Sequence, residues 1–445
     1  MGRKTQMVRS SHPIGNKTMV LNGGFLPFAQ PLIGPEEIRE VVAVLKSRWL
    51  TTGAKTRQFE YEFAKYVGCK HAIAVNSGTA ALHLALEAIG VKPGDEIVTS
   101  PMTFTATTEV MTYLGARPLF TDIDPGTMNM DVNKLENLIK SKFSRNRKSK
   151  LKAILPVHYG GYPCPMDEIL RLAREYGIAV IEDAAHAFPA LYRGRMVGTI
   201  GKVTCFSFYA TKTITTGEGG MITTEENSLA ERMRIMSLHG ISKDAWKRYT
   251  AEGSWYYEVI APGFKYNLTD IAAALGLAQL KKADFFRKER KKIAEEYDRA
   301  FADMDEIEPP GGDRDDFFND PSERMRNLHS WHLYVIKLKL GRLAIDRDAF
   351  IQALKEKGIG TSVHFIPLHI HPYYRKTYGF KPDDFPVAYD AYKRIVSLPI
   401  YPGMKTRDVR RVIDAVHDIV AKNKKKSFPG PKEGKDNPVF IRNSC

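Results

Sequence analysis

Ile181-Glu-Asp-Ala-Ala-His186, then Cys205-Phe-Ser-Phe-Tyr-Ala-Thr-Lys212, then Thr216-Gly-Glu-Gly-Gly220: these three segments decide the fold. The first one ends an apolar run of the kind that forms a buried strand, and it places acidic residues where that strand stops. On either side, apolar strand-like runs alternate with amphipathic helical stretches. That alternation predicts an α/β fold with a mostly parallel sheet, whose ligands bind at the carboxyl ends of the strands.

The expected strands of this sheet are residues 71–75, 96–99, 117–121, 152–157, 178–182, 203–208 and 220–223, and helices are expected at 78–90, 105–114, 166–176 and 227–238. A helix opening at Gly34-Pro35-Glu36-Glu37 comes before them. One long helix over 269–303 is expected to bridge two domains. We expect a flexible basic leader (1–20), a large domain (21–285), a smaller α+β domain (286–421) and a disordered basic tail (422–445). In the small domain a loop (309–327), a strand (331–340) and helices near 347–357, 386–395 and 406–421 are expected.

The spacing of Asp183, Ser207 and Lys212 suits a pyridoxal phosphate pocket. A lysine can bond to the cofactor's aldehyde only while its amine is neutral, and a desolvated pocket favours the neutral form. Asp183 would face the pyridine nitrogen and keep the ring protonated, and Ser207 would give a hydroxyl to the phosphate. By itself this spacing is weak, because most lysines are solvated surface residues.

Three more residues or segments strengthen the prediction. Asn76-Ser-Gly-Thr follows a strand and opens a helix, so the amides of Gly78 and Thr79 could bind a phosphate; a plain capped helix start is the equal alternative. Phe104 follows the next strand and could stack on a flat ring, or it could belong to the core. His186 could reach the ring hydroxyl, or it could be a structural hydrogen-bonding residue.

The chain has 445 residues and a formal net charge of +15, and this charge is concentrated in three places. Residues 1–20, 139–152 and 422–445 carry a combined charge of +16, which leaves −1 for the rest. The composition therefore argues against a nucleic-acid-binding face spread over the fold. Solvated surface and loop is the preferred interpretation of the basic segments.

The four cysteines are Cys69, Cys164, Cys205 and Cys445, and their wide separation suits a reducing compartment. Neither a disulfide framework nor a metal site is expected. The sequence also lacks a signal-peptide core and an apolar run of membrane-spanning length. A cytoplasmic enzyme that does not act on membranes is the resulting expectation.

Seven motifs in order give the chain a resemblance to a known family. Ser77-Gly-Thr-Ala-Ala-Leu, Pro101-Met-Thr-Phe, Glu182-Asp-Ala-Ala-His, Phe206-Ser-Phe-Tyr-Ala-Thr-Lys, Gly217-Glu-Gly-Gly, Trp331-His-Leu-Tyr and Ser397-Leu-Pro-Ile-Tyr-Pro together resemble the DegT/DnrJ/EryC1/StrS aminotransferases. The match covers about residues 26 to 421. It implies a fold-type-I pyridoxal-phosphate-dependent transferase, a homodimer with active sites at the subunit interface, and transfer of an amino group to the keto sugar of a nucleotide sugar.

The resemblance also assigns roles to matching positions. It makes Lys212 the residue bonded to the cofactor, puts Asp183 on the pyridine nitrogen, and puts His186 near the ring oxygen. Phe104 becomes the stacking aromatic, and Gly78, Thr79 and Ser207 become phosphate ligands. Glutamate is the expected donor, and a nucleoside-diphosphate 4-keto-6-deoxy hexose the expected acceptor, in amino-sugar and cell-surface polysaccharide biosynthesis.

One motif departs from the family pattern. Many members carry Gly-Tyr-Asn-Tyr-Arg-Met, whose Asn reaches the partner subunit's cofactor phosphate, whereas this chain has Gly263-Phe-Lys-Tyr-Asn-Leu. Lys265 takes the aligned position, so either Lys265 or Asn267 could fill that role. His364 and His369 lie in a stretch that resembles a substrate loop, and contact with substrate or packing are equal alternatives for both.

Two rival functions remain open from the sequence. A sugar dehydratase of the same family would carry a histidine in place of Lys212, so the lysine argues against it. A non-enzymatic scaffold whose basic tails bind nucleic acid is disfavoured because Lys212, Asp183 and Ser207 are all intact.

Overall fold

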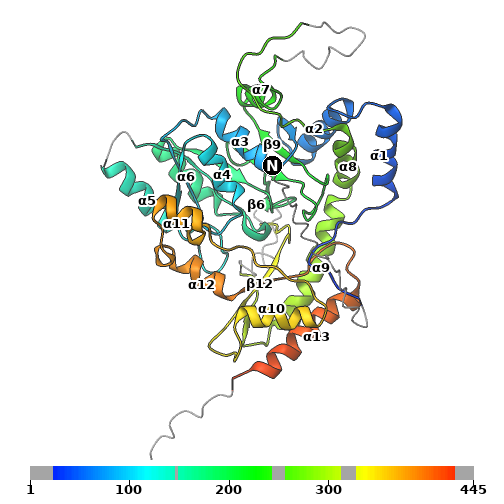
Figure 1. Cartoon of the computed structure of the whole chain (residues 1–445), viewed down its shortest axis with the longest axis vertical. Coiled ribbons are helices and arrows are strands. Elements are labelled where there is room, and N and C mark those ends of the chain that lie inside the picture. The colour runs from blue at the N-terminus through cyan, green and yellow to red at the C-terminus, as the bar shows by residue number, and fades with distance from the viewer. Residues whose placement is uncertain (1–23, 146–148, 243–255, 312–326, 426–445) are drawn as a thin grey trace, which may run out of the picture.

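The computed structural model describes residues 24–145, 149–242, 256–311 and 327–425. Its centre is a seven-stranded sheet in the order β1-β9-β8-β5-β4-β2-β3 (Figure 1). Its strands are β1 (His71–Val75), β2 (Glu96–Thr99), β3 (Arg117–Phe120), β4 (Leu151–Ile154), β5 (Ala179–Asp183), β8 (Val203–Ser207) and β9 (Gly220–Thr224). The pairs from β3 through β8 are parallel, and β9 pairs antiparallel with both β8 and β1. The prediction of an α/β fold with a mostly parallel sheet is confirmed.

Apolar side chains alternate along the strands and bury both faces of the sheet, as expected for strands covered by helices on each side. On one face, Val180 and Phe206 pack with helices α2 (Ala54–Val67), α5 (Val132–Arg145), α6 (Met166–Tyr176) and α8 (Asp270–Leu280). On the other, Ile181 and Cys205 pack with α3 (Gly78–Ala88), α4 (Ala106–Tyr113) and α7 (Asn227–Met236). The short hairpin of β6 (Leu191–Tyr192) and β7 (Arg195–Met196) stands apart from this sheet.

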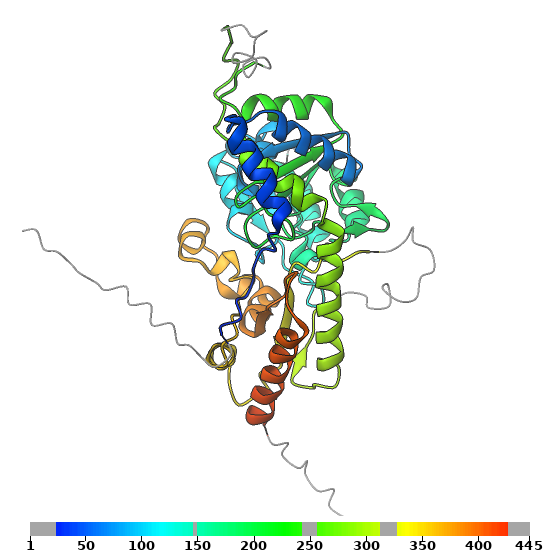
Figure 2. The same cartoon turned by 90° about the vertical axis from the view of Figure 1, so that its right-hand side faces the viewer.

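Helix α9 (Ala283–Phe301) extends from the large sheet to a second, smaller core (Figure 2). There it packs with a three-stranded antiparallel sheet and two further helices. The sheet comprises β10 (Ile307–Glu308), β11 (Tyr334–Leu338) and β12 (Ile395–Leu398), and the helices are α10 (Arg347–Glu356) and α13 (Thr406–Asn423). Helices α11 (Pro372–Tyr378) and α12 (Pro386–Arg394) form smaller clusters at the edge of the large sheet. Tyr374 of α11 packs with Phe120 of β3, and Ala388 of α12 packs in a cluster with Val335 of β11.

Several features of the structure differ from the sequence-based expectation, which lacked helices α5 and α11 and strands β10 and β12. Helix α2 was not predicted, because Thr51-Thr52-Gly53 looks like the end of the preceding helix. In the structure that helix already ends at Ser47, and Gly53 is the N-cap of α2. The expected single helix over 269–303 is two helices, interrupted at Lys281 and Lys282. Helix α13 continues to Asn423, whereas the basic leader 1–20 and residues 426–445 lie outside the described residues.

The basic segment 139–152 is partly helical. Its first residues form the end of α5, where Lys140 pairs with Glu136 and Lys142 Nζ lies 2.7 Å from Glu96 Oε1. None of the described helices is both long enough and apolar enough to cross a membrane.

The start of α2 is held by a carboxylate that belongs to another helix. Asp270, the first residue of α8, is buried, and its Oδ1 accepts hydrogen bonds from Gly53 N (2.8 Å) and Thr56 N (2.9 Å). Its Oδ2 accepts one from Lys55 N at 3.1 Å. The first amides of a helix have no acceptor within it, and the positive end of its dipole favours an anion. Asp270 therefore joins the starts of α2 and α8, which are more than 200 residues apart in the sequence.

Replacing Asp270 with Ala should lower the free energy of unfolding by about 3 kcal/mol, because several buried donors lose a charged acceptor at once. Asp346→Ala is the control, since Asp346 caps α10 at the surface through one bond and should cost about 1 kcal/mol. Urea unfolding monitored by circular dichroism measures both. Equal losses for the two variants would contradict this account of Asp270.

Candidate active site

The predicted site residues meet at the carboxyl end of the parallel strands. Strand β5 ends at Asp183, which stands beside Cys205 of β8 in the parallel register. Strand β8 ends two residues later at Ser207, and a turn then leads to Lys212, whose N–H donates to Tyr209 O. The β5–β8 pairing therefore brings together residues that are far apart in the sequence.

Asp183 is buried and fixed by two donors. Its Oδ2 accepts a hydrogen bond from Thr107 Oγ1 at 2.8 Å, and its Oδ1 accepts one from Ala185 N at 3.1 Å. Thr107 in turn bonds to Thr103 at 2.7 Å. Burial raises the pKa of Asp183, although the Ala185 and Thr107 bonds and the charge of Lys212 oppose this. A ring cation beside this carboxylate would favour its ionised form further.

Lys212 lies in a desolvated environment. Burial lowers its pKa to about 8, against the attraction of Asp183 and with a further lowering by the positive charge of Arg290. A substantial fraction of the amine is therefore neutral near pH 8, where an ordinary lysine is almost fully protonated. This is the property that a nucleophilic lysine requires.

A small cradle lies between the start of α3 and the end of β8. Ser77 caps α3 by accepting a bond from Ala80 N at 3.0 Å, and Gly78 and Thr79 begin the helix without acceptors inside it. A Cβ on Gly78 would lie 2.9 Å from Ser207 Cβ, so only glycine allows this approach. Backbone amides at a helix N-terminus beside a hydroxyl fit a phosphate group.

Three histidines, one of them three residues after Asp183, lie close together. The ring of His186 is 4.4 Å from that of His332 and 6.5 Å from that of His364. Burial lowers the pKa of His186 and of His332 well below the ordinary value, and lowers that of His364 to about 4. His364 Nδ1 is 2.8 Å from Ser397 Oγ, whereas Nδ1 of both His186 and His332 is buried without a hydrogen-bond partner among the described residues. All three are neutral near pH 7, and two of them have polar atoms available to a bound group.

Phe104 is 60% exposed, which leaves the ring available for stacking. Its closest aromatic neighbour in the site is Phe365, at a centroid distance of 6.2 Å, and Phe365 also stacks on His186. The alternative that Phe104 is a core residue is therefore wrong. The rings of Phe104, Phe365 and His186 therefore form a continuous row of aromatic contacts.

Lys265 and Asn267 lie next to Asn76, the residue that precedes the cradle of Ser77, Gly78 and Thr79 in the sequence. Asn76 Nδ2 donates to Lys265 O at 3.2 Å, and Lys265 Nζ contacts Asn267 Oδ1. Asn267 also donates to Thr52 Oγ1 at 2.7 Å, so Lys265 has the more exposed side chain of the two. Whether either reaches a partner subunit's phosphate stays a prediction.

His369 does not join the other predicted residues. It is fully buried, its ring is 5.0 Å from Phe385, and its Nε2 bonds to Pro382 O at 3.1 Å. Packing, the alternative left open by the sequence, therefore accounts for His369. Thr107 and His332 are not among the site residues predicted from the sequence. Both lie in or near a family motif, because Thr107 follows Pro101-Met-Thr-Phe and His332 belongs to Trp331-His-Leu-Tyr.

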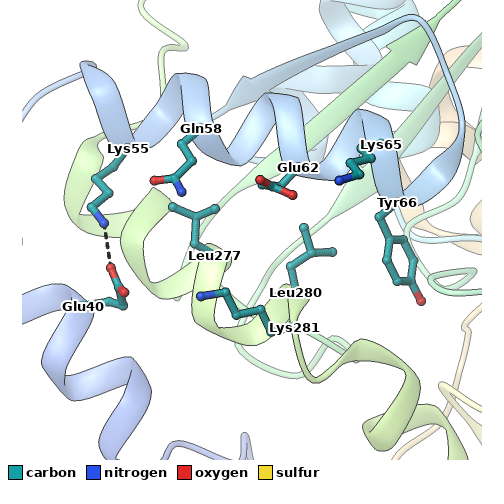
Figure 3. A pocket seen from close by; sticks show the side chains of 9 residues that line it. All are labelled: Glu40, Lys55, Gln58, Glu62, Lys65, Tyr66, Leu277, Leu280 and Lys281. Carbon is teal, nitrogen blue, oxygen red and sulfur yellow. Dashed lines mark hydrogen bonds and ion pairs between the residues drawn. The ribbon is translucent and has the colours of Figure 1, made fainter.

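A separate pocket of about 510 Å³ lies between α1 (Pro35–Ser47), α2 and α8 (Figure 3). Its floor contains Leu277 and Leu280, and its rim mixes lysines with glutamates, including a Lys55–Glu40 ion pair of 2.7 Å. It contains none of the predicted site residues. We assign no function to it.

The groups at the sheet edge fit pyridoxal phosphate one by one: a partly neutral lysine for the aldehyde, a buried carboxylate for the pyridine nitrogen, and a glycine cradle with a serine for the phosphate. The fold and site thus define a fold-type-I pyridoxal-phosphate-dependent transferase.

The chain belongs to the DegT/DnrJ/EryC1/StrS aminotransferase family, whose model matches residues 31–417. It is 51% identical to the spore coat polysaccharide biosynthesis protein SpsC of Bacillus subtilis, over 89% of this chain and 97% of SpsC. Among solved structures it is similar to the putative sugar aminotransferase Spr1654 of Streptococcus pneumoniae in its PLP form (TM-score 0.79, 32% identity, 89% of this chain and 99% of that one). It is also similar to Helicobacter pylori PseC, an aminotransferase involved in the biosynthesis of pseudoaminic acid (TM-score 0.79, 29% identity, 90% and 100%).

These comparisons confirm the predicted family, the fold type, the pyridoxal phosphate cofactor and the enzyme class. The protein is an aminotransferase of sugar biosynthesis. Spr1654 has been solved in both PLP and PMP forms, the two cofactor states between which an aminotransferase alternates.

Replacing Thr107 with Val should raise the pKa of Asp183, because the ionised carboxylate loses a donated hydrogen bond. The carboxylate then becomes protonated at a higher pH, so the acid limb of the kcat/KM profile should move upward and cofactor affinity should fall. Profiles from pH 5 to 9 and a titration with pyridoxal phosphate measure these effects.

Thr108→Val is the matched control, because Thr108 is an equally buried neighbour whose hydroxyl contacts Tyr374 instead. An acid limb that stays in place in Thr107→Val, or that moves equally in both variants, would show that Thr107 does not tune Asp183.

Proposed function

We propose that the protein transfers an amino group from glutamate to the keto group of a nucleotide sugar, with a nucleoside-diphosphate 4-keto-6-deoxy hexose as the acceptor. The observation that carries this proposal is Lys212, a half-buried lysine at the carboxyl end of the sheet whose desolvation lowers its pKa to about 8. The names of SpsC and PseC support a product used in amino-sugar and surface-polysaccharide biosynthesis.

Lys212 acts as the base in this proposal. At pH 8 about half of its amine is neutral, against about 0.3% for a lysine with a pKa of 10.5. Its Nζ can therefore accept the proton from the α-carbon of the donor amino acid and, in the second half-reaction, deliver one to the sugar carbon that becomes aminated.

Asp183 and the cradle orient the cofactor for this transfer. Pyridoxal phosphate, when bound, supplies an electron sink for the charge that develops at the reacting carbon. Asp183 holds the ring nitrogen end, since its carboxylate is fixed by Thr107 and Ala185. Gly78, Thr79 and Ser207 hold the phosphate end, and Phe104 covers one face of the ring.

The rival functions receive less support. A dehydratase of this family lacks the lysine, and here Lys212 stands in the setting that a transaminating base needs. A scaffold that binds nucleic acid would act through basic termini, which lie largely outside the described residues. The cytoplasmic location stays a prediction.

A homodimer is also part of this proposal. One side of helix α1 packs against α8. The other side carries Ile38, Val42 and Leu45, whose side chains are 58%, 38% and 51% exposed. These residues recur at helical spacing, so they form one apolar stripe of the kind that protein interfaces cover. Phe104, a residue of the site itself, is also exposed in the single chain. A second copy is the occupant that would cover these surfaces.

The half-reactions provide the test of function. Glutamate added to the purified pyridoxal phosphate form should convert it to the pyridoxamine phosphate form, and a keto-sugar nucleotide should reverse the change. Absorbance spectroscopy follows both steps, and a panel of amino acids and keto-sugar nucleotides identifies the pair of substrates.

Lys212→Ala is the control for this test, because it removes the base and should abolish turnover. If no amino acid changes the spectrum of the wild-type form, the proposed donor half fails; if Lys212→Ala turns over at a near wild-type rate, the role of the lysine is wrong.

For the dimer, Val42→Glu should shift the mass in sedimentation equilibrium from two chains to one, because it places a charge in the apolar stripe. Ala43→Glu introduces the same charge at an exposed position of the same helix about 100° away from Val42, outside the stripe, and should leave the mass unchanged. A wild-type protein that sediments as one chain at micromolar concentration would refute this assembly.

A further inference from the structure

Arg290 is a buried cation that has no role in the catalytic groups described above. It lies on α9, it is 2% exposed, and one end of its guanidinium is anchored to backbone. Nη1 donates to the carbonyl oxygens of Ile400 (2.6 Å), Trp331 (3.3 Å) and His332 (3.3 Å). Among the described ion pairs, none joins Arg290 to a carboxylate.

The other edge of this guanidinium is not used by the protein. Nε is buried and has no hydrogen-bond partner within the described part of the chain. The N–H groups of Nε and Nη2 form a fork that matches the two oxygens of a carboxylate. Burial lowers the pKa of Arg290 to about 9, which still leaves it charged at neutral pH. A buried charge with an unsatisfied donor is costly, and an anionic ligand would remove that cost.

The contacts of Arg290 place it at the active site. The carbonyl that it holds belongs to His332, whose ring lies 4.4 Å from that of His186, three residues after Asp183. In agreement with this placement, its positive charge lowers the pKa values of Lys212 and His332. A group that reacts at Lys212 therefore lies within the field of Arg290.

We propose that Arg290 binds the α-carboxylate of the donor amino acid through its Nε and Nη2 edge. This inference rests on the proposed function, because it needs an amino-acid donor. The α-carboxylate is attached to the carbon from which Lys212 takes the proton, so a cation near Lys212 is where that carboxylate must be neutralised. A keto sugar has no carboxylate at the reacting carbon, and Arg290 therefore selects amino acids in the donor half-reaction.

A pair of donors that differ only in the α-carboxylate tests this role. Glutamate is compared with 4-aminopentanoate, in which a methyl group replaces the α-carboxylate and the distal carboxylate remains. In single-turnover absorbance measurements the wild-type enzyme should react with glutamate at least about 30-fold faster, since losing one partner of a buried charge pair costs that much or more. Arg290→Met should lose this preference by slowing glutamate alone. It should also weaken the equilibrium binding of 2-oxoglutarate, which calorimetry measures without turnover.

Lys337→Met is the matched control, because Lys337 is also a buried cation of the smaller core but bonds to Pro125 O and contacts Glu308. It should keep the wild-type preference. Arg290→Lys, which retains the charge without the fork, serves if Arg290→Met does not fold, and it should keep only part of the preference.

Three results would overturn the proposal: a wild-type enzyme that reacts equally with both donors, an Arg290 variant that slows both donors to the same extent, or one that keeps the full preference for glutamate. The last two leave the proposed function intact, because the wild-type enzyme still reacts with glutamate. If no amino acid changes the wild-type spectrum, the proposed function itself fails.

Discussion

The register between β5 and β8 is the constraint on which the whole site depends. The two acidic residues at the end of β5 point to opposite faces of the sheet, as neighbours on a strand must. Glu182 faces the buried side, where it accepts hydrogen bonds from Thr204 Oγ1 (2.7 Å), Gly201 N (2.7 Å) and His158 Nε2 (2.9 Å). His158 Nδ1 accepts from Cys164 N, so its proton is on Nε2 and is donated to Glu182. Burial raises the pKa of Glu182, but these bonds outweigh it and hold the pKa below its ordinary value. Glu182 therefore ties β5 to β8 and to His158, whereas its neighbour Asp183 faces the site on the other side of the sheet.

Much of this arrangement could be predicted because it is local in the sequence. The strands expected over 71–75 and 96–99 agree with β1 and β2 at both ends, and the helix over 166–176 agrees with α6. Most other expected strands end within one residue of the observed ones, whereas 152–157 runs three residues beyond the end of β4. The residues with short-range signals, Gly78, Ser207 and Lys212, follow directly from strand and helix ends. Helix α2 escaped prediction because its start depends on Asp270, more than 200 residues further along the chain. The break at Lys281 also lies beyond local periodicity, since the helical pattern continues across it.

The contacts that complete the site are long-range, and no single-sequence pattern reveals them. Thr107 becomes a partner of Asp183 only after β2 and β5 are placed in one sheet. Arg290 has the spacing of an ordinary charged residue on an amphipathic helix, and only the fold shows that it is buried against three carbonyl groups. His369 illustrates the reverse case: its motif suggested a substrate loop, whereas tertiary packing places it against Phe385.

The charge distribution connects these observations. Most of the +15 belongs to the terminal segments and to 139–152, so the body of the protein has no overall positive field with which to collect anionic ligands. It has individually placed groups instead: the helix amides at Gly78 and Thr79, which we propose bind a phosphate, and one buried cation, Arg290, which we propose binds a carboxylate. Under the proposed function, donor and acceptor use the same site in turn, and a buried cation suits the small amino acid that we propose as the donor. The exposed side near Phe104 suits the larger sugar nucleotide that we propose as the acceptor, because its charged part need not enter the desolvated pocket. Local donors of this kind can separate two anionic substrates that a general positive potential would attract alike.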